Sequence, residues 1–198
     1  MFVSIEGVDG CGKSTQARFL EEHLRSLGRE VVSTREPGGT ELGERVRQLV
    51  LNGPQMAPWA EAALFAASRA EHAAEVIRPA LARGADVVSD RFIDSSLAYQ
   101  GIARGLGLDA VLGLNLTVLE GLLPNRTFVI AVDAVEAGRR REGDPDRIER
   151  EGDEFQAEVG RAYEQLAARF PERVELIDGS LTPEEIAALV QARVEDLA

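Results

Sequence analysis

The chain has 198 residues, 44% of them hydrophobic and 28% charged, a balance typical of a globular protein with one sizeable core. Its formal net charge of −12 argues against a nucleic-acid polymer or an anionic membrane as a partner, and no apolar run reaches the ~18 residues that a membrane span needs. The single cysteine, Cys11, cannot form an internal disulfide, and we expect a cytoplasmic protein.

Short apolar runs alternate with longer helical patterns from one end of the chain to the other. The first helical pattern places Ala17, Leu20, Leu24 and Leu27 on one face and stops at Gly28. Because strands that alternate with helices are joined by right-handed crossovers, this order predicts an α/β fold whose parallel sheet is covered by helices on both faces. The runs that we expect to form its five strands are Phe2–Ile5, Glu30–Thr34, Ala85–Ser89, Thr127–Val132 and Arg173–Ile177.

A glycine-rich loop follows the first predicted strand. Residues 7–14 read Gly-Val-Asp-Gly-Cys-Gly-Lys-Ser and match the P-loop pattern G-x-x-x-x-G-K-[ST], in which backbone N–H groups and a helix N-terminus face phosphate oxygens. Lys13, the only lysine among 22 basic residues, then reaches the β- and γ-phosphates, and the Ser14 hydroxyl ligates Mg²⁺. The predicted nucleotide-binding residues are Gly7, Val8, Asp9, Gly10, Cys11, Gly12, Lys13, Ser14 and Thr15.

Two acidic residues could supply the carboxylate that binds Mg²⁺ in a P-loop protein together with the hydroxyl of Ser14. Asp90 follows the run 86–89, and Asp133 follows the run 128–132. Each lies at the carboxyl end of a predicted buried strand, which is where such a carboxylate belongs, so the pattern alone leaves both open. The guanine-reading pattern N-K-x-D does not occur in the sequence, which argues against a GTPase switch.

A strongly charged segment precedes the last predicted helices. Residues 138–147 read Gly-Arg-Arg-Arg-Glu-Gly-Asp-Pro-Asp-Arg, and Gly143 and Pro145 interrupt any regular helix there. The segment is either a lid over a site or a solvated charged loop. Further on, Thr182 and Glu185 have the spacing of a capping box, which predicts the start of the final helix.

Four segments together resemble the thymidylate kinase family over nearly the whole chain. They are the P-loop at 7–14, Thr-Arg-Glu-Pro-Gly-Gly-Thr at 34–40, Leu-Phe-Ala-Ala-Ser-Arg at 64–69, and Val-Ser-Asp-Arg-Phe-Ile-Asp-Ser-Ser-Leu-Ala-Tyr-Gln at 88–100. The resemblance implies a single nucleoside monophosphate kinase domain over 1–198, of the P-loop NTPase type with three layers and a short lid at about 138–151. It implies transfer of the γ-phosphoryl group of ATP to dTMP, with Mg²⁺ held by Ser14 and Asp90.

The same resemblance assigns roles in a dTMP site. Phe65 would stack on the thymine ring, and Arg69, one helical turn later, would donate to the base carbonyl O4. Arg91 would hold the dTMP phosphate, and Asp9 would contact the sugar 3′-hydroxyl and help to orient the acceptor. The remaining substrate residues are Ser96 at the base edge, Tyr99 under the deoxyribose, and Glu36, Pro37 and Gln100 lining the site.

The chain departs from part of the family inside the P-loop. Some members carry an arginine three residues before the lysine, where this chain has Gly10, and members of the other type supply arginines from the lid. The family also often has an arginine in the loop after Pro37, where this chain has Gly39, so the phosphate would rest mainly on Arg91 with help from Arg35 or the lid. The catalytic residues expected are Asp9, Lys13, Arg91, Arg139, Arg140, Arg141 and Arg147.

Alternatives remain open for the oligomeric state and for the reaction. Family members are homodimers, and the Ala-rich helical stretch Glu61–Ala82 could bury one face against a second subunit, although apolar helix faces usually pack in the core. A kinase for another nucleotide or deoxynucleoside is the nearest alternative to dTMP phosphorylation. A nucleotide-dependent regulatory protein without phosphotransferase activity is a more distant one.

Overall fold

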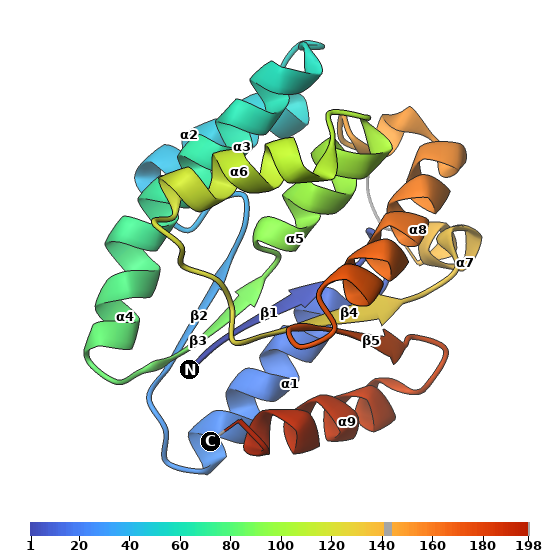
Figure 1. Ribbon diagram of the computed structural model, residues 1–198. Coiled ribbons are helices and arrows are strands. Elements are labelled where there is room, and N and C mark those ends of the chain that lie inside the picture. Colours follow the sequence, from blue (N-terminus) through green and yellow to red (C-terminus); the bar gives the residue numbers. More distant parts are fainter. Residues whose placement is uncertain (141–143, 198) are drawn as a thin grey trace.

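Five parallel strands form one sheet in the computed structural model, which describes residues 1–140 and 144–197 (Figure 1). Their order across the sheet is β2-β3-β1-β4-β5. Each strand begins and ends within one residue of the run predicted for it, so the predicted α/β fold is confirmed. The strands are β1 (Phe2–Glu6), β2 (Val31–Arg35), β3 (Asp86–Asp90), β4 (Arg126–Ala131) and β5 (Val174–Asp178).

The register of the sheet decides which residues meet at its carboxyl edge. Strand β1 lies in the centre and is buried along its whole length. Ile5 pairs with Asp90 of β3, Asp90 pairs in turn with Arg35 of β2, and Glu6 pairs with Val129 of β4. Because all strands are parallel, the loops that leave their carboxyl ends lie side by side, which is where a parallel α/β sheet binds its ligands.

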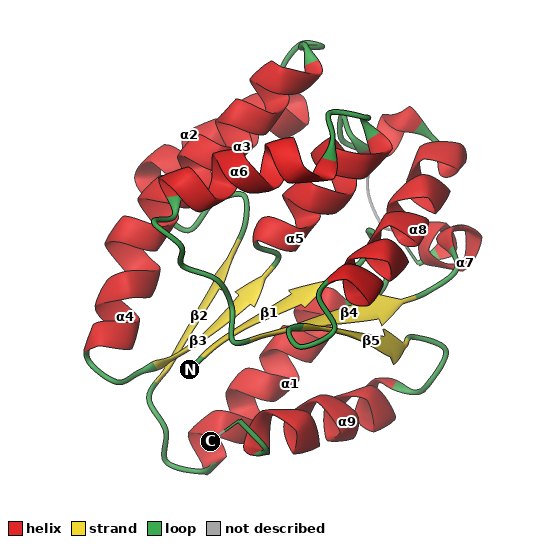
Figure 2. Ribbon diagram, viewed as in Figure 1, coloured by secondary structure: helices red, strands yellow, loops and turns green. Residues whose placement is uncertain are grey.

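Helices cover both faces of this sheet (Figure 2). Helices α1 and α9 pack together on one face, and α5, η2 and α8 lie on the other, where η2 packs against α8 as well as against α3 and α6. The helices are α1 (Lys13–Ser26), α2 (Glu41–Asn52), α3 (Pro58–His72), α4 (Arg78–Ala82), α5 (Ile93–Ser96), α6 (Leu108–Val118), α7 (Ala134–Arg139), α8 (Asp153–Arg169) and α9 (Pro183–Glu195), with the π-helical segments η1 (Ala73–Ile77) and η2 (Leu97–Ala103) and the 3₁₀ turn η3 (Glu149–Glu151).

Most helical predictions hold, with one difference in detail. Ala17, Leu20 and Leu24 of α1 are buried, but Leu27 lies beyond the last helical residue and is 54% exposed. The capping box predicted at Thr182 is present, with both of its hydrogen bonds. None of the helices among the described residues is long and apolar enough to cross a membrane.

The Ala-rich stretch at 61–82 is helical throughout but not uniform. It runs from α3 through the π-helical turn η1 into α4, whose second residue is Pro79. Proline has no N–H to donate and its ring crowds the preceding turn, so a wider turn before it keeps the helix continuous.

Candidate active site

A cavity of about 100 Å³ opens between the carboxyl edge of the sheet and the helices α2, α3 and η2. Its wall contains every residue predicted to bind dTMP except Arg69, which is buried one helical turn beyond Phe65. The cavity is lined by Asp9, Glu36, Pro37, Arg47, Leu51, Phe65, Arg91, Ser95, Ser96, Tyr99, Gln100, Asp146 and Ile148.

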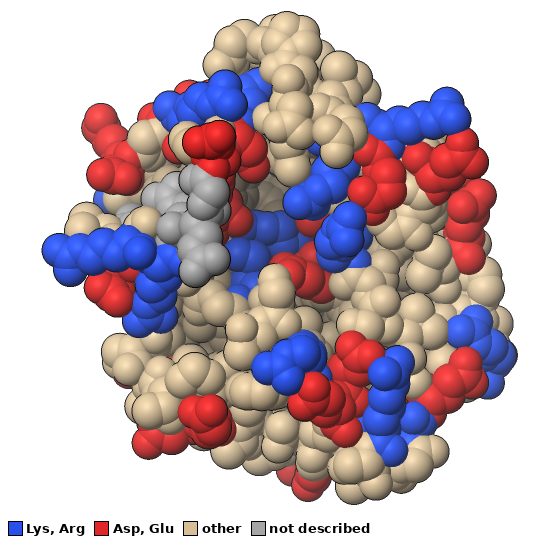
Figure 3. All heavy atoms as spheres, turned by 180° about the vertical axis from the view of Figure 1, so that it is seen from behind, with Lys and Arg blue, Asp and Glu red and all other residues tan. Residues whose placement is uncertain are grey.

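A second, wider hollow of about 410 Å³ adjoins the first at the P-loop. Basic side chains gather on its floor and rim, although the protein as a whole is acidic (Figure 3). Both cavities share Asp9, Glu36, Arg47 and Arg91, so the hollow at the P-loop and the cavity at Phe65 adjoin each other. The hollow is lined by Asp9, Gly10, Gly12, Lys13, Ser14, Thr15, Arg35, Glu36, Arg47, Asp90, Arg91 and Arg140.

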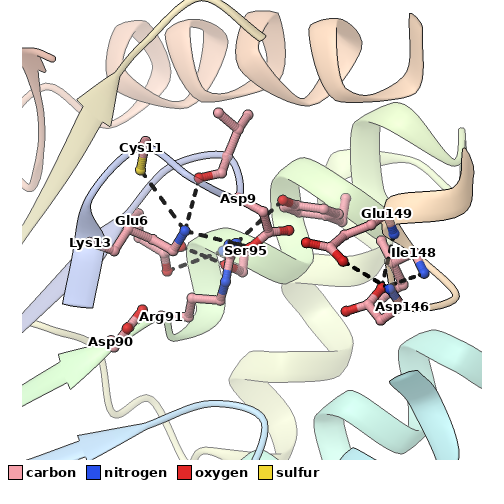
Figure 4. A network of polar contacts seen from close by, with 12 residues as sticks. Glu6, Asp9, Cys11, Lys13, Asp90, Arg91, Ser95, Asp146, Ile148 and Glu149 are labelled. Carbon is pink, nitrogen blue, oxygen red and sulfur yellow. Dashed lines mark hydrogen bonds and ion pairs between the residues drawn. The ribbon is translucent and has the colours of Figure 1, made fainter. Parts of the chain in front are cut away.

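The P-loop holds its lysine close to the loop backbone (Figure 4). Gly12 caps helix α1 with φ +98°, a left-handed conformation that a residue with a side chain rarely adopts. The Lys13 ammonium donates to the Val8 carbonyl at 2.9 Å and lies 3.7 Å from an Asp9 carboxylate oxygen. The cation is therefore held inside the curve of the loop, facing the hollow that it lines.

The two predicted metal-side oxygens are in direct contact. The Ser14 hydroxyl donates to Asp90 Oδ2 at 2.5 Å. Asp133, the alternative that the sequence left open, instead accepts the backbone N–H groups of Val135 and Glu136 and caps helix α7. No cluster of three or more His, Cys, Asp or Glu side chains suited to a metal occurs in the described part of the chain. A cation at Ser14 and Asp90 would therefore take its other ligands from phosphate or water.

Arg91 stands between the two cavities and has several partners (Figure 4). Its guanidinium donates to Asp9 at 2.6 Å and to the Ser95 hydroxyl at 2.9 Å, and it packs over the Tyr99 ring at 5.4 Å. Burial opposes the charge of Arg91, but Asp9, Tyr99, Tyr163 and Glu6 together outweigh it, so the pKa of Arg91 lies above its ordinary value. Arg91 is therefore a fixed cation at the junction of the two spaces.

Glu6 lies directly behind Arg91, and its role was not predicted from the sequence. Its carboxylate accepts the backbone N–H of Phe92 at 2.8 Å, the Ser95 hydroxyl at 2.6 Å and the Tyr163 hydroxyl at 2.9 Å. Burial, followed by the charge of Asp94, raises the pKa of Glu6 from 4.5 to about 7. Glu6 thus anchors the turn that presents Arg91.

Arg69 is buried and held by acceptors on three different elements. Its Nε donates to Glu36 at 2.7 Å, one amino group contacts the Asn115 side-chain oxygen, and the other donates to the Phe92 carbonyl at 3.2 Å. The second oxygen of Glu36 contacts His72 at 3.0 Å, and the peptide bond between Glu36 and Pro37 is cis. The base contact expected of Arg69 stays a prediction.

The lid arginines differ sharply from one another. Arg147 is buried, donates to the Val50 carbonyl at 2.8 Å and to Glu61 of α3 at 2.7 Å, and lines neither cavity. Arg139 and Arg140 are exposed and, among the residues that the structure describes, form ion pairs with Glu136; of these two Arg140 lines the P-loop hollow. Arg141 lies outside the described residues. A catalytic role for any of these arginines stays a prediction, and for Arg147 it would require breaking the contact with Glu61.

Arg47 of helix α2 is the site cation that sequence reasoning missed. It lines both cavities and donates to the Pro37 carbonyl at 3.0 Å. Burial, followed by the charge of Arg35, lowers the pKa of Arg47. Arg35 and Arg47 are thus two neighbouring cations, and an anion bound between them would stabilise both charges. The signal was available: Gly39 leaves the loop after Pro37 without an arginine, and the next helix brings Arg47 to the same place.

Comparison with known proteins gives a consistent result. The sequence model of the family described as thymidylate kinase matches residues 5–190. A thymidylate kinase of Bifidobacterium longum strain NCC 2705 is 46% identical over 100% of this chain and 98% of that protein. One from Leifsonia xyli subsp. xyli is 50% identical over 98% and 94%. The crystal structure of thymidylate kinase from Ehrlichia chaffeensis superposes with a TM-score of 0.80 at 33% identity, and the match covers 98% of both chains.

Proposed function

This chain belongs to the thymidylate kinase family and transfers the γ-phosphoryl group of ATP to dTMP, and we propose that ATP lies along the P-loop hollow while dTMP fills the cavity at Phe65. The observation that carries this arrangement is the pair of adjoining cavities that share Arg91, with Lys13 lining one and Phe65 lining the other. A donor and an acceptor phosphate placed from the two cavities would meet beside Arg91.

In this arrangement the reaction depends on positioning and on charge. An oxygen of the dTMP phosphate forms the new bond to the γ-phosphorus, and the bond from that phosphorus to the β–γ bridging oxygen breaks. The attacking oxygen is already anionic, so the step needs no general base. Lys13 and Arg91 offset the charge that spreads over the transferring group. Asp9, which contacts both cations, keeps their side chains oriented toward each other and is available to the sugar 3′-hydroxyl.

Mg²⁺ suits the oxygen pair formed by Ser14 and Asp90. A hydroxyl and a carboxylate in contact at 2.5 Å are hard oxygen donors, and Mg²⁺ in nucleotide sites takes one or two such protein groups together with phosphate oxygens and water. We assign these two residues to the ion. When bound, Mg²⁺ neutralises charge on the β- and γ-phosphates.

The base end of the cavity favours thymine on two grounds. Phe65 supplies an apolar ring to the cavity wall, against which a pyrimidine can stack, and Ser96 and Gln100 supply polar groups at its edge. Arg69 carries more N–H donors than its three contacts use, which leaves it able to donate to the carbonyl O4 of thymine. Cytosine carries an amino group in place of O4, and this donor would face the donor N–H groups of Arg69 without forming a hydrogen bond.

The lid and the domain boundaries remain part of the proposal. Residues 1–198 would form a single domain, with a lid at about 138–151 that carries arginines to the phosphates. Among the described lid arginines, Arg140 is the best placed, because it already lines the hollow beside Lys13. Closure of such a segment would exclude water and so suppress hydrolysis of ATP.

A substrate panel tests the function. We expect dTDP to form from dTMP and ATP, with dTMP preferred over dCMP, dAMP and dGMP and a weaker preference over dUMP, because one methyl group contributes about 1–3 kcal/mol. Turnover of dCMP as fast as dTMP would contradict the reading of the base. Slow ATP hydrolysis with no acceptor activity would instead support a regulatory protein.

We also propose a homodimer and a cytoplasmic location. Leu42 and Leu49 of α2 and Trp59 of α3 are large exposed apolar side chains on helices that pack together, and Ala63 and Ala67 form an exposed small-residue face on α3. Sedimentation should give a dimer, and Ala63→Glu should shift it to a monomer if this face is the interface. Cys11 is a buried free thiol, as expected in a reducing compartment, and cell fractionation would test the location.

A further inference from the structure

The side-chain amide of Gln100 can read a pyrimidine in two opposite ways. Its carbonyl oxygen accepts a hydrogen bond, whereas its amino group donates one. Thymine carries a hydrogen on N3, and cytosine has an acceptor lone pair there. Which end of the amide faces the base therefore decides whether the cavity pairs with thymine or with cytosine at this atom.

The structure places a carboxylate at one end of this amide. Gln100, on η2, is 2% exposed and lines the cavity, and its Nε2 donates to Glu61 Oε1 of α3 at 2.8 Å. An ionised carboxylate only accepts hydrogen bonds, so the amino group and not the carbonyl must turn toward Glu61. The orientation follows from the chemistry of Glu61, and the Gln100 carbonyl is left for the cavity.

Other contacts keep Glu61 ionised although it is 1% exposed. Burial alone would raise the pKa of Glu61, but hydrogen bonds from Arg104, Gln100 and Arg147 outweigh it, and the pKa lies below its ordinary value. Arg104 donates to both carboxylate oxygens, at 2.9 and 3.2 Å, and Arg147 donates to Oε2 at 2.7 Å. The two arginines therefore maintain the acceptor that orients Gln100.

We propose that Glu61, which does not line the cavity, is a specificity-determining positioning residue: it fixes the Gln100 amide with its carbonyl toward the substrate, so that the site selects a pyrimidine with a hydrogen on N3. The inference rests on the proposed function, in which thymine occupies the cavity at Phe65. Arg69 would then donate to the carbonyl O4 of thymine, and the Gln100 carbonyl would accept the hydrogen on N3. Glu61 orients Gln100 for the second of these contacts.

The test compares kcat/KM for dTMP and dCMP in three variants. Glu61→Gln offers Gln100 either a donor or an acceptor, and Glu61→Asp keeps the charge but shortens the reach. We expect each to lower the dTMP:dCMP ratio at least about tenfold, mainly through a higher KM for dTMP, since an unpaired buried polar group weakens binding. The exchanged pair Glu61→Gln with Gln100→Glu again directs an acceptor at the base, and it should restore the ratio.

Glu151→Gln is the matched control. It removes an exposed ion pair from Arg104 but leaves every contact of Glu61 and Gln100, so the ratio should stay within about twofold of wild type. Thermal unfolding identifies which variants fold. An unchanged ratio in a folded Glu61→Gln or Glu61→Asp protein, or a loss that the exchanged pair does not restore, overturns the proposal. A wild-type protein without preference for dTMP would contradict the proposed function instead.

Discussion

The phosphate end and the base end of the site are built in different ways. At the phosphate end, loops at the carboxyl ends of β1 and β3 hold Lys13 and Arg91 against Asp9 and backbone oxygen, acceptors that substrate phosphates could replace. At the base end, helix side chains such as Arg69 and Glu61 are buried in networks whose partners come from three or more elements. Contacts that phosphate oxygens can replace suit Lys13 and Arg91, which must bind the phosphoryl group during transfer. Fully buried networks suit Arg69 and Glu61, which must keep one orientation.

We expect the largest loss of kcat at Lys13, and this variant tests whether the phosphate end acts on turnover separately from dTMP binding. Lys13→Ala should lower kcat by two to three orders of magnitude, because one strong transition-state contact contributes about 3–4 kcal/mol. The dissociation constant of dTMP should hardly change, since Lys13 does not line the cavity at Phe65. Steady-state kinetics and equilibrium binding measure the two separately. Arg18→Ala, an exposed substitution on the same helix, is the control, and near-normal kcat in Lys13→Ala would refute the P-loop mechanism.

Glu6 is an exception to this difference between the two ends, because it gives the phosphate end a buried network of its own. Between its ordinary pKa of 4.5 and about 7, the folded protein keeps a proton on Glu6 that the unfolded chain has released. Raising the pH through this window therefore favours unfolding, by an amount on the order of 3 kcal/mol, and the loss ends above it. Asp94 adds to this effect, whereas Arg91 opposes it.

Glu6→Gln resembles the protonated form, so this variant should lack that part of the pH dependence. Denaturant unfolding of both proteins between about pH 5 and 8 gives the required free energies. Glu22→Gln, which changes an exposed carboxylate, should behave as wild type. Parallel curves for wild type and Glu6→Gln would show that Glu6 stays ionised throughout.

The smallest effect expected concerns the lid. Arg140→Ala should lower kcat about tenfold with little change in dTMP binding, because a contact made mainly in the closed complex affects the transition state more than the ground state. Arg139→Ala, one residue away but outside the hollow, should change kcat less than twofold. If Arg140→Ala keeps wild-type kcat, that arginine belongs to a solvated loop.

The sequence predicted the fold well because buried parallel strands are short apolar runs with clear ends. It predicted the P-loop because glycines and a lysine at fixed spacing carry that chemistry locally. The strand pattern alone could not choose between Asp90 and Asp133, since both end a strand, and it was the family resemblance that selected Asp90. In the fold Asp90 is the one in contact with Ser14.

Besides Arg47, sequence reasoning missed two buried carboxylates. Glu61 is separated by 39 residues from Gln100 and by 86 from Arg147, so nothing near it in the chain distinguishes it from a surface glutamate. Glu6 likewise contacts Phe92 and Tyr163 across separations of 86 and 157 residues. A network of this kind becomes visible only when the fold brings distant segments together.

Arg91 has a φ of +71°, a conformation that costs a residue with a side chain roughly 1–2 kcal/mol. The next residue, Phe92, turns into the core and packs edge to face on Phe2 at 4.9 Å, so one turn separates a reacting surface from the interior. Glycine would fit this backbone with less strain, but it carries no cation and would lose the contacts that Arg91 makes with Asp9 and Ser95. The fold therefore stores backbone strain at the residue that joins the two cavities, and the contacts of its cation hold that strained turn in place.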